Sequence, residues 1–399
     1  MNRNVPKLRF KGFEDEWKKE VLGDLIVEKI EKTEDKGKYP LYSLTIESGV
    51  VPKSDRYERE FLVKKEGNFK IVNNNDFVYN PMNLRFGALA IYKGDFPVSV
   101  SGYYNVFSFK NRGLEKFWDN YLKTHRMMYL YNTIATGSLE EKKRVHYSQF
   151  KELKLPMPSL KEQEKIANFL SRVDSIMGKQ EKKVEYWNSY KKGMMQKIFK
   201  QEIRFKDENG RDYPEWEERA LKKIIKEDLY PVNKPNVAYE KLSVRSHAKG
   251  TFSSRVDDPA TVAMDTLYEV KENQLIVNIT FAWEHAISIV KKEDEGKLVS
   301  HRFPTYKFNP DCYYKFYEYV IKQSSLKYKL GLASPGGAGR NRVLNKKEFL
   351  KIEVQHPCFE EQTKIANFLS NIDSIIEKEN QKLEELRQWK KGLLQQMFV

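Results

Sequence analysis

The chain has 399 residues and is 40% hydrophobic, so it can form about two or three domains with sizeable cores. Its formal net charge of +15 favours a polyanionic partner, either nucleic acid or an acidic membrane surface. No apolar run approaches the roughly 18 residues of a membrane span, no signal-peptide core opens the sequence, and two cysteines make neither a disulfide framework nor a zinc site. A basic cytoplasmic protein is therefore expected.

The first block, residues 1–158, mixes short β-rich runs with turns. Apolar and aromatic runs bounded by Asn, Gly, Asp and Pro predict strands over 77–79, 88–92 and 106–109. A helical stretch follows over 115–131. This pattern is typical of an α+β domain.

The second segment, residues 159–200, predicts one long helix that contains no proline from 162 to 199. Its apolar residues recur in rows seven apart, as at a coiled-coil seam. Nearly forty helical residues are about 55–60 Å long, and one such helix cannot bury its apolar stripe alone. The predicted seam residues are Ile166, Leu170, Val173, Val184 and Trp187.

The third and fourth segments, residues 201–357 and 358–399, repeat this order. The third predicts strands over 275–277, 286–290 and 305–308 and a helical stretch over 314–330. The fourth predicts a second long helix, with the seam residues Ile365, Leu369, Ile372, Leu383 and Leu386.

The two halves form a tandem duplication. Residues 162–171 and 361–370 are identical at nine of ten positions, at a constant offset of 199, whereas the blocks before the helices diverge. Antiparallel pairing of the two helices is the simplest arrangement. Packing of each helix on its own block, or a homodimeric coiled coil, are the alternatives. Gln180 and Glu379 share one seam position and predict a polar layer that fixes the register.

Basic and hydrogen-bonding residues cluster in the loops of both blocks. Lys and Arg neutralise phosphates, and Arg also bonds guanine O6 and N7. We therefore predict DNA contacts from Arg85, Tyr103, Lys142, Lys143 and Arg144 in the first block, and from Arg245, His247, Lys249, Arg255, His301, Arg302, Arg340 and Arg342 in the second.

The motifs of DNA-linked enzymes do not occur in the sequence. There is no GxxxxGK[ST] phosphate loop, GxGxxG fingerprint or GxSxG elbow. Residues 80–83 lack the second proline and the aromatic residue of an adenine methyltransferase motif, so we interpret them as a turn. No catalytic residue and no metal site are assigned, which favours a binding and scaffolding protein.

Three rival functions are a freestanding sequence-specific DNA-binding protein, an active methyltransferase or nuclease, and an architectural coiled-coil protein without base preference. Two unlike blocks argue against the first, because repressors usually place identical domains on palindromes. The missing motifs argue against the second.

The chain resembles the specificity subunit of type I restriction-modification systems along essentially its full length. The resemblance rests on residues 6–13 with Trp17, on the helical segment 162–174 with Lys191-Lys192-Gly193, and on the recurrence of these signatures in the second half. Residues 278–284 also resemble part of the family's recognition domains.

This resemblance implies two tandem α/β target recognition domains joined by two long antiparallel coiled-coil helices, an α+β fold. Each domain would read one half of a bipartite, asymmetric site in double-stranded DNA. Two methyltransferase subunits, which use S-adenosylmethionine, and two restriction subunits, which use ATP and Mg²⁺, would bind this frame. The subunit itself would be non-catalytic and carry no cofactor.

The resemblance also implies that the helices set the unread spacer. Four residues inserted between 179 and 183 and between 378 and 382 would add about 6 Å, a little under two base pairs at roughly 3.4 Å each. We expect the spacer to lengthen by about one or two base pairs while both half-sites keep their sequences. Methylome sequencing measures this, and an unchanged spacer or altered half-site letters would contradict it.

Overall fold

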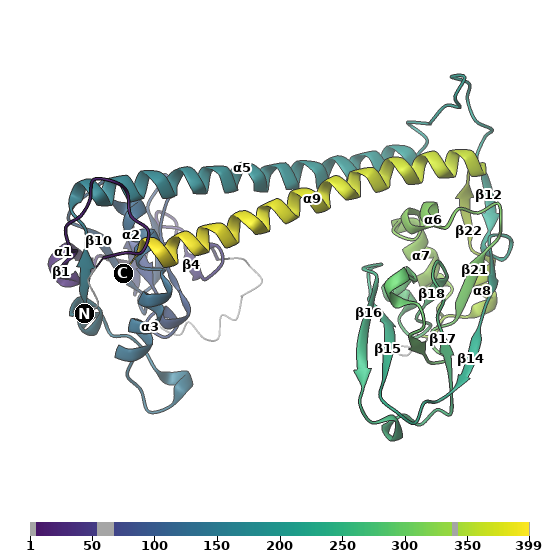
Figure 1. The fold of residues 1–399 in the computed structure, drawn as a ribbon, viewed down its shortest axis with the longest axis horizontal. Helices are drawn as coiled ribbons and strands as arrows, with labels where there is room; N and C mark the ends of the chain where they lie inside the picture. The colour runs from purple at the N-terminus through teal and green to yellow at the C-terminus, as the bar shows by residue number, and fades with distance from the viewer. Residues whose placement is uncertain (1–4, 54–67, 337–341, 399) are drawn as a thin grey trace. The chain divides into compact units, whose positions relative to one another are not determined.

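The computed structural model describes residues 5–53, 68–336 and 342–398, and the chain forms two compact units. Unit 1 comprises residues 1–183 and 379–399, and unit 2 comprises residues 184–378. Each unit thus combines one variable block with a part of both long helices, as the ribbon shows (Figure 1). The four-part division at residues 158, 200 and 357 remains a prediction from the sequence.

Unit 1 contains the first variable block. Its strands are β1 (Lys18–Val21), β2 (Ile26–Lys29), β3 (Lys32–Thr33), β4 (Tyr42–Thr45), β5 (Gly49–Pro52), β6 (Phe69–Val72), β7 (Phe77–Tyr79), β8 (Leu89–Ile91), β9 (Val98–Ser101), β10 (Asn105–Phe109) and β11 (Lys154–Met157). Its helices are α1 (Leu22–Leu25), the 3-10 turns η3 (Leu84–Phe86) and η4 (Glu140–Lys142), α2 (Glu115–Tyr121), α3 (His125–Ile134) and α4 (Tyr147–Lys151), and the long helix α5 (Leu160–Phe199) begins here.

Unit 2 contains the second variable block. Its strands are β12 (Glu217–Ala220), β13 (Ile225–Glu227), β14 (Tyr230–Asn233), β15 (Tyr239–Val244), β16 (Thr251–Val256), β17 (Thr266–Glu269), β18 (Leu275–Val277), β19 (Ile287–Ile289), β20 (Leu298–Val299), β21 (Thr305–Phe308) and β22 (Glu353–His356). Its helices are η5 (Leu221–Lys223), η6 (Pro259–Thr261), η7 (Ala282–Glu284), η8 (Lys292–Asp294), α6 (Tyr314–Val320), α7 (Ser324–Leu332) and α8 (Lys346–Lys351), and the second long helix α9 (Phe359–Met397) begins here.

Both blocks share a frame despite their sequence divergence. The four-stranded sheet β2-β10-β7-β8 of unit 1 has the counterpart β13-β21-β18-β19 in unit 2, and both are antiparallel. The pair β1–β11 recurs as β12–β22 in the same register. All six strands predicted from the sequence are present, with ends within two residues of the predicted bounds. The expected α+β class is confirmed.

The predicted helical stretches differ from expectation, and the remaining sheets differ between the two blocks. Each predicted helical stretch, 115–131 and 314–330, is two helices, because the chain turns after α2 and after α6. In the first block Thr124 caps the next helix, its side chain accepting a hydrogen bond from Met127 N. The remaining strands also differ: unit 2 has a five-stranded sheet, β14-β17-β20-β15-β16, where unit 1 has smaller sheets.

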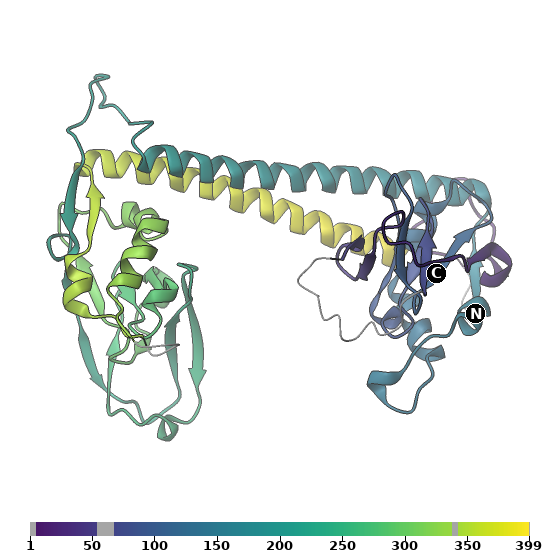
Figure 2. The ribbon, with the colours of Figure 1, turned by 180° about the vertical axis from the view of Figure 1, so that it is seen from behind.

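The long helices run antiparallel in each unit (Figures 1 and 2). In unit 1, Lys390 Nζ of α9 lies 2.6 Å from Asp174 Oδ1 of α5. The repeat-equivalent pair, Lys191 and Asp373, is bonded in unit 2. Of the predicted seam residues, Val184, Trp187 and Leu386 are half-buried, and seven are buried, at 0–6% exposure: Ile166, Leu170, Val173, Ile365, Leu369, Ile372 and Leu383.

The seam residues nearest each helix start lie in domain cores rather than in a two-helix interface alone. Ile166, Leu170 and Val173 share the core of unit 1 with residues from the far end of α9, and Ile365, Leu369 and Ile372 share the core of unit 2 with Ile198 of α5. Antiparallel helix pairing and packing of each helix on its own block, which the sequence presents as alternatives, therefore occur together.

An aromatic residue from the end of one long helix packs in the larger core of each unit. Phe398 stacks on Tyr121 in unit 1, with ring centroids 5.1 Å apart. Its repeat equivalent, Phe199, stacks on Phe316 in unit 2 at 5.8 Å. Equivalent segments also lie against the end of each long helix. Residues 201–203 continue directly from α5 in the chain. At the end of α9 the N-terminal segment takes this place, and Leu8 N donates to Gln396 O at 2.9 Å.

A buried ion pair joins the start of each long helix to its domain. Arg9 donates to both carboxylate oxygens of Glu162, at 2.7 and 2.8 Å, and the Glu162 side chain is 1% exposed. In unit 2, Arg204 Nη2 and Trp216 Nε1 donate to Glu361 Oε2 at 3.0 and 2.9 Å. Removing one partner from a buried ion pair costs about 3–5 kcal/mol, so these contacts fix the starts of α5 and α9.

The predicted contact between Gln180 and Glu379 is present in unit 1. Gln180 Nε2 donates to Glu379 Oε2 at 2.7 Å and to Glu379 O at 2.8 Å, and Lys183 Nζ lies 3.0 Å from Glu379 Oε1. The hydrogen bonds from Gln180 and then from Lys183 lower the pKa of Glu379 to about 2. That this layer fixes the register stays a prediction.

Glu379→Gln should lower the Tm of the chain at neutral pH, and the difference from wild type should shrink on acidification. Because the folded-state pKa lies below the ordinary 4.5, the stabilisation is complete above that value and is lost as the pH falls towards 2. Thermal unfolding between about pH 7 and about pH 2.5 measures the difference, with the exposed Glu384→Gln as control. A difference that does not depend on pH would refute the assignment.

Candidate nucleic-acid interface

Three segments of unit 1 gather at one edge of the sheet β2-β10-β7-β8, namely the edge at which β7 ends and β8 and β10 begin. Residues 80–87 connect β7 to β8 and contain η3. The turn before β10, residues 102–104, is adjacent because Asn105 pairs with Tyr79. Residues 136–144 reach the same edge because Val145 N donates to Pro81 O at 2.9 Å. The strand pairing thus brings together parts of the chain that are distant in the sequence.

The first-block candidates lie on these three segments. Tyr103 is 42% exposed in the turn before β10. Lys142 and Lys143 lie in and after η4, and Arg144 pairs with Thr136 through backbone hydrogen bonds at 2.9 and 3.0 Å. Arg85 lies on η3. The structure therefore places all five predicted residues on the segments at one sheet edge.

Arg85 differs from the other candidates because its guanidinium is already engaged. It forms an ion pair with Glu140, hydrogen bonds Asn132 Oδ1 at 3.3 Å, and its side chain is only 6% exposed. Lys143 Nζ lies 2.7 Å from the same Glu140 carboxylate. Hydrogen bonds from Lys143 and then Arg85 lower the pKa of Glu140. Arg85 is therefore held in place by its neighbours rather than presented to solvent.

The corresponding edge of unit 2 collects four segments. Residues 278–285 connect β18 to β19, Ile279 N donates to Arg302 O at 3.0 Å, and Leu344 N donates to Ile279 O at 2.8 Å. The turn of the β15–β16 hairpin joins them, since His247 N donates to Glu284 O at 2.9 Å and Ser246 Oγ to Glu284 Oε2 at 2.8 Å.

Most second-block candidates lie on these segments. The structure places Arg245, His247 and Lys249 on the hairpin turn, His301 and Arg302 after β20, and Arg342 beside η7. Arg255 does not join them, because it lies on β16 beyond the turn and its Nε donates to Asp257 at 2.9 Å. Arg340 lies outside the described residues.

Exposed aromatic residues lie on the two connecting loops. The sequence predicted no DNA contact from them, although residues 278–284 resemble part of the family's recognition domains. Phe86 is 58% exposed and Phe281 is 41% exposed. Arg85 stacks on the Phe86 ring, with Cζ 4.5 Å from the centroid, and Arg342 stacks on Trp283 at 5.6 Å. The sequence does contain a signal that the two loops are equivalent, because Asn80 and Asn278 directly follow equivalent strands at an offset of 198.

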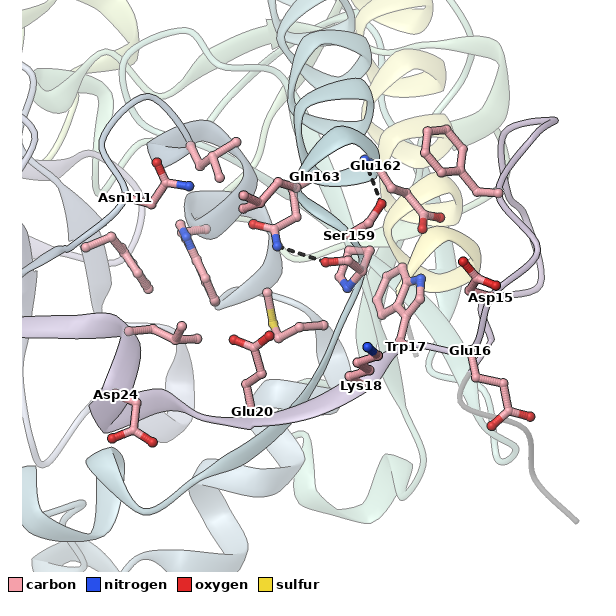
Figure 3. Close-up of a pocket in the computed structure, with 18 of the residues that line it drawn as sticks. Asp15, Glu16, Trp17, Lys18, Glu20, Asp24, Asn111, Ser159, Glu162 and Gln163 are labelled. Carbon is pink, nitrogen blue, oxygen red and sulfur yellow. Dashed lines mark hydrogen bonds between the residues drawn. The ribbon is translucent and has the colours of Figure 1, made fainter.

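A pocket of about 520 Å³ in unit 1 lies elsewhere, at the start of α5 (Figure 3). Its walls include Arg9, Trp17, Glu162 and Gln163, which belong to the repeated framework. It also includes Phe109, at the opposite end of β10 from Asn105. The pocket therefore belongs to the joint between helix and domain rather than to the sheet edge that carries the basic residues.

Unit 2 brings together side chains that the sequence spacing does not associate. Asp311, Cys312 and His356 each place a potential ligand atom within 4.8 Å of the others. Their hydrogen-bonding capacity is largely used: Arg219 pairs with Asp311, and the Tyr317 hydroxyl lies 2.6 Å from His356 Nδ1. Burial raises the pKa of Cys312 to about 11. We therefore interpret this group as part of the protein's internal packing.

Among the described residues, no helix has the length and apolar character needed to span a membrane. The fold is similar to that of two solved structures. The S subunit of a type I restriction-modification system from M. genitalium aligns over 99% of both chains, with a TM-score of 0.53 and 16% identity. A chain from a structure on complex assembly and conformational transition of the type I system aligns over 98% of this chain and 99% of that chain, with a TM-score of 0.54 and 12% identity.

Sequence comparison identifies the same family. The MjaX type I restriction enzyme specificity subunit of Methanocaldococcus jannaschii is 25% identical over 333 residues, covering 80% of this chain and 76% of that protein. The MjaVIII specificity subunit of the same organism is 28% identical over 275 residues, covering 61% of each. The family described as Type I restriction modification DNA specificity domain matches residues 14–186 and 215–388, one match in each half. The chain belongs to the DNA specificity subunits of type I restriction-modification systems.

Proposed function

We propose that the two variable blocks read the two halves of a bipartite, asymmetric site in double-stranded DNA, one half each. The observation that carries this proposal is that basic side chains gather at the same sheet edge in both units. The four-stranded sheet is equivalent in the two units, whereas the residues on its loops differ. An asymmetric site suits two domains whose frames match and whose loops differ. The net charge of +15 supports a polyanionic partner.

The long helices would act as the frame on which other subunits assemble. We infer two methyltransferase subunits, which bind S-adenosylmethionine, and two restriction subunits, which bind ATP and Mg²⁺. In this arrangement the cofactors belong to the partners, and the complex modifies host DNA and restricts foreign DNA. The specificity subunit contributes recognition and assembly, because members of this family are non-catalytic.

The purified chain should bind DNA without methylating or cutting it, and the binding should weaken steeply with salt. If about six or more phosphates are neutralised, affinity should fall on the order of 10³-fold between about 50 and 200 mM salt. Fluorescence anisotropy across this range measures the slope, and incubation with S-adenosylmethionine or Mg²⁺ tests for turnover. Turnover by rigorously pure chain, or salt-independent binding, would contradict the proposal.

Replacing Arg340 and Arg342 together with alanine should weaken or relax recognition of one half-site only. Removing a phosphate-binding or base-binding side chain should cost roughly 1–3 kcal/mol of binding free energy. Selection from randomised duplex DNA reads both half-sites at once, and the other half should keep its letters. Arg255→Ala is a matched control, because Arg255 lies in the same unit but away from this sheet edge. Equal changes in both halves would argue against independent reading.

A further inference from the structure

The loop that connects β7 to β8 and the loop that connects β18 to β19 have the same backbone conformation, although their sequences differ. Asn80 Oδ1 accepts from Met82 N at 3.0 Å, and Asn278 Oδ1 accepts from Thr280 N at 3.1 Å. The loop backbone bonds also recur at an offset of 198: Phe86 N donates to Asn83 O at 3.0 Å, as Glu284 N donates to Phe281 O at 2.9 Å. We call residues 80–87 and 278–285 the tip loops.

Both tip loops also end and pack alike. Each ends in a left-handed residue, Gly87 with φ 93° and His285 with φ 67°. Left-handed backbone is unfavourable for histidine and ordinary for glycine. The recurrence of this conformation despite that cost indicates that the loop shape itself is retained. The helices α3 and α7 support η3 and η7, respectively.

The side chains on this common backbone are not alike. The inward position is apolar and fully buried in both loops, as Leu84 and Ala282. The next two positions differ, with Arg85 and Phe86 in one loop and Trp283 and Glu284 in the other. Phe86 is exposed, whereas the other three side chains are half-buried. A constant backbone that carries different side chains at these positions is suited to recognising different surfaces with one geometry.

An arginine supports an aromatic ring on each tip loop. Arg85 stacks on Phe86 in unit 1, and Arg342 stacks on Trp283 in unit 2, both within the roughly 6 Å range of cation–π contacts. Because Glu140 and Asn132 hold the Arg85 guanidinium, Arg85 is suited to fixing the ring rather than to binding DNA. The Phe86 ring itself remains 58% exposed.

We propose that Phe86 and Trp283 are specificity-determining residues, each making apolar contact with base edges in the major groove of its own half-site. The 5-methyl group of thymine is the apolar feature of that groove. The surrounding basic residues, Arg342 among them, would bind phosphates and orient the loop, while Arg85 acts as a positioning residue through its stacking. This inference rests on the proposed function and names the side chains that carry it out.

The test is selection from randomised duplex DNA by the full-length chain, co-purified with its methyltransferase subunit, using wild type, Phe86→Ala and Trp283→Ala. We expect each variant to lose preference at one or two positions of a single half-site, by about 5- to 150-fold per position. The two variants should affect opposite halves. Phe86→Leu and Trp283→Phe, which keep an apolar group, should retain part of the preference. Circular dichroism melts of all variants show whether the fold is kept.

Matched controls are Phe96→Ala and Tyr230→Ala, which remove exposed aromatic residues at 51% and 41% exposure. Phe96 follows β8, at the end opposite η3. Tyr230 begins β14, two residues after Asp228, which accepts a hydrogen bond from Gln274 just before β18. Both controls should keep the wild-type site. If Phe86→Ala and Trp283→Ala also keep it, the inference is wrong and the proposed function stands. If both change the same half, the inference is wrong and so is the reading of one half by each block. A wild-type chain that selects no interrupted site overturns the proposed function and the inference with it.

Discussion

The larger hydrophobic core of each unit is completed by residues from both long helices, and the rest of the structure depends on this sharing. In unit 1 the core combines Ile166, Leu170 and Val173 near the start of α5 with residues near the end of α9. Unit 2 reverses the roles. Burial of apolar surface is the main stabilising contribution to folding, so neither variable block has a complete core without both helices. The loops can differ between the blocks because this shared frame does not depend on them.

The sequence predicted what is encoded locally. Runs such as 77–79 and 305–308 are apolar and bounded by turn residues, and both are strands. The helical stretch 115–131 was predicted as one piece because its apolar pattern continues across a break that Thr124 caps. Long-range pairing was beyond reach: the five-stranded sheet includes a parallel contact between Lys241 and Leu298 that no local pattern specifies.

The candidate site also depends on long-range contacts that the sequence does not reveal. Basic residues could be identified in the sequence, but their position at one sheet edge follows from strand pairing. The ion pair of Arg85 with Glu140 joins residues 55 apart, so the sequence could not show that this guanidinium is occupied. Phe86 was not considered because aromatic residues are usually assigned to cores. Trp283 lies within residues 278–284, which resemble part of the family's recognition domains, but it was given no contact role. That Phe86 is exposed and Trp283 half-buried became evident only from the folded loops.

The division of the chain into one continuous and one discontinuous unit affects folding during synthesis. Domains generally fold in order from the N-terminus as the ribosome produces them. Here unit 2 is the continuous segment 184–378, whereas unit 1 needs Leu393, Met397 and Phe398 to complete its core. The first domain to be translated is therefore the last to be finished. Until the end of α9 emerges, the core of unit 1 lacks these residues and the apolar surface that they cover stays exposed, which is the condition in which folding intermediates become prone to aggregation.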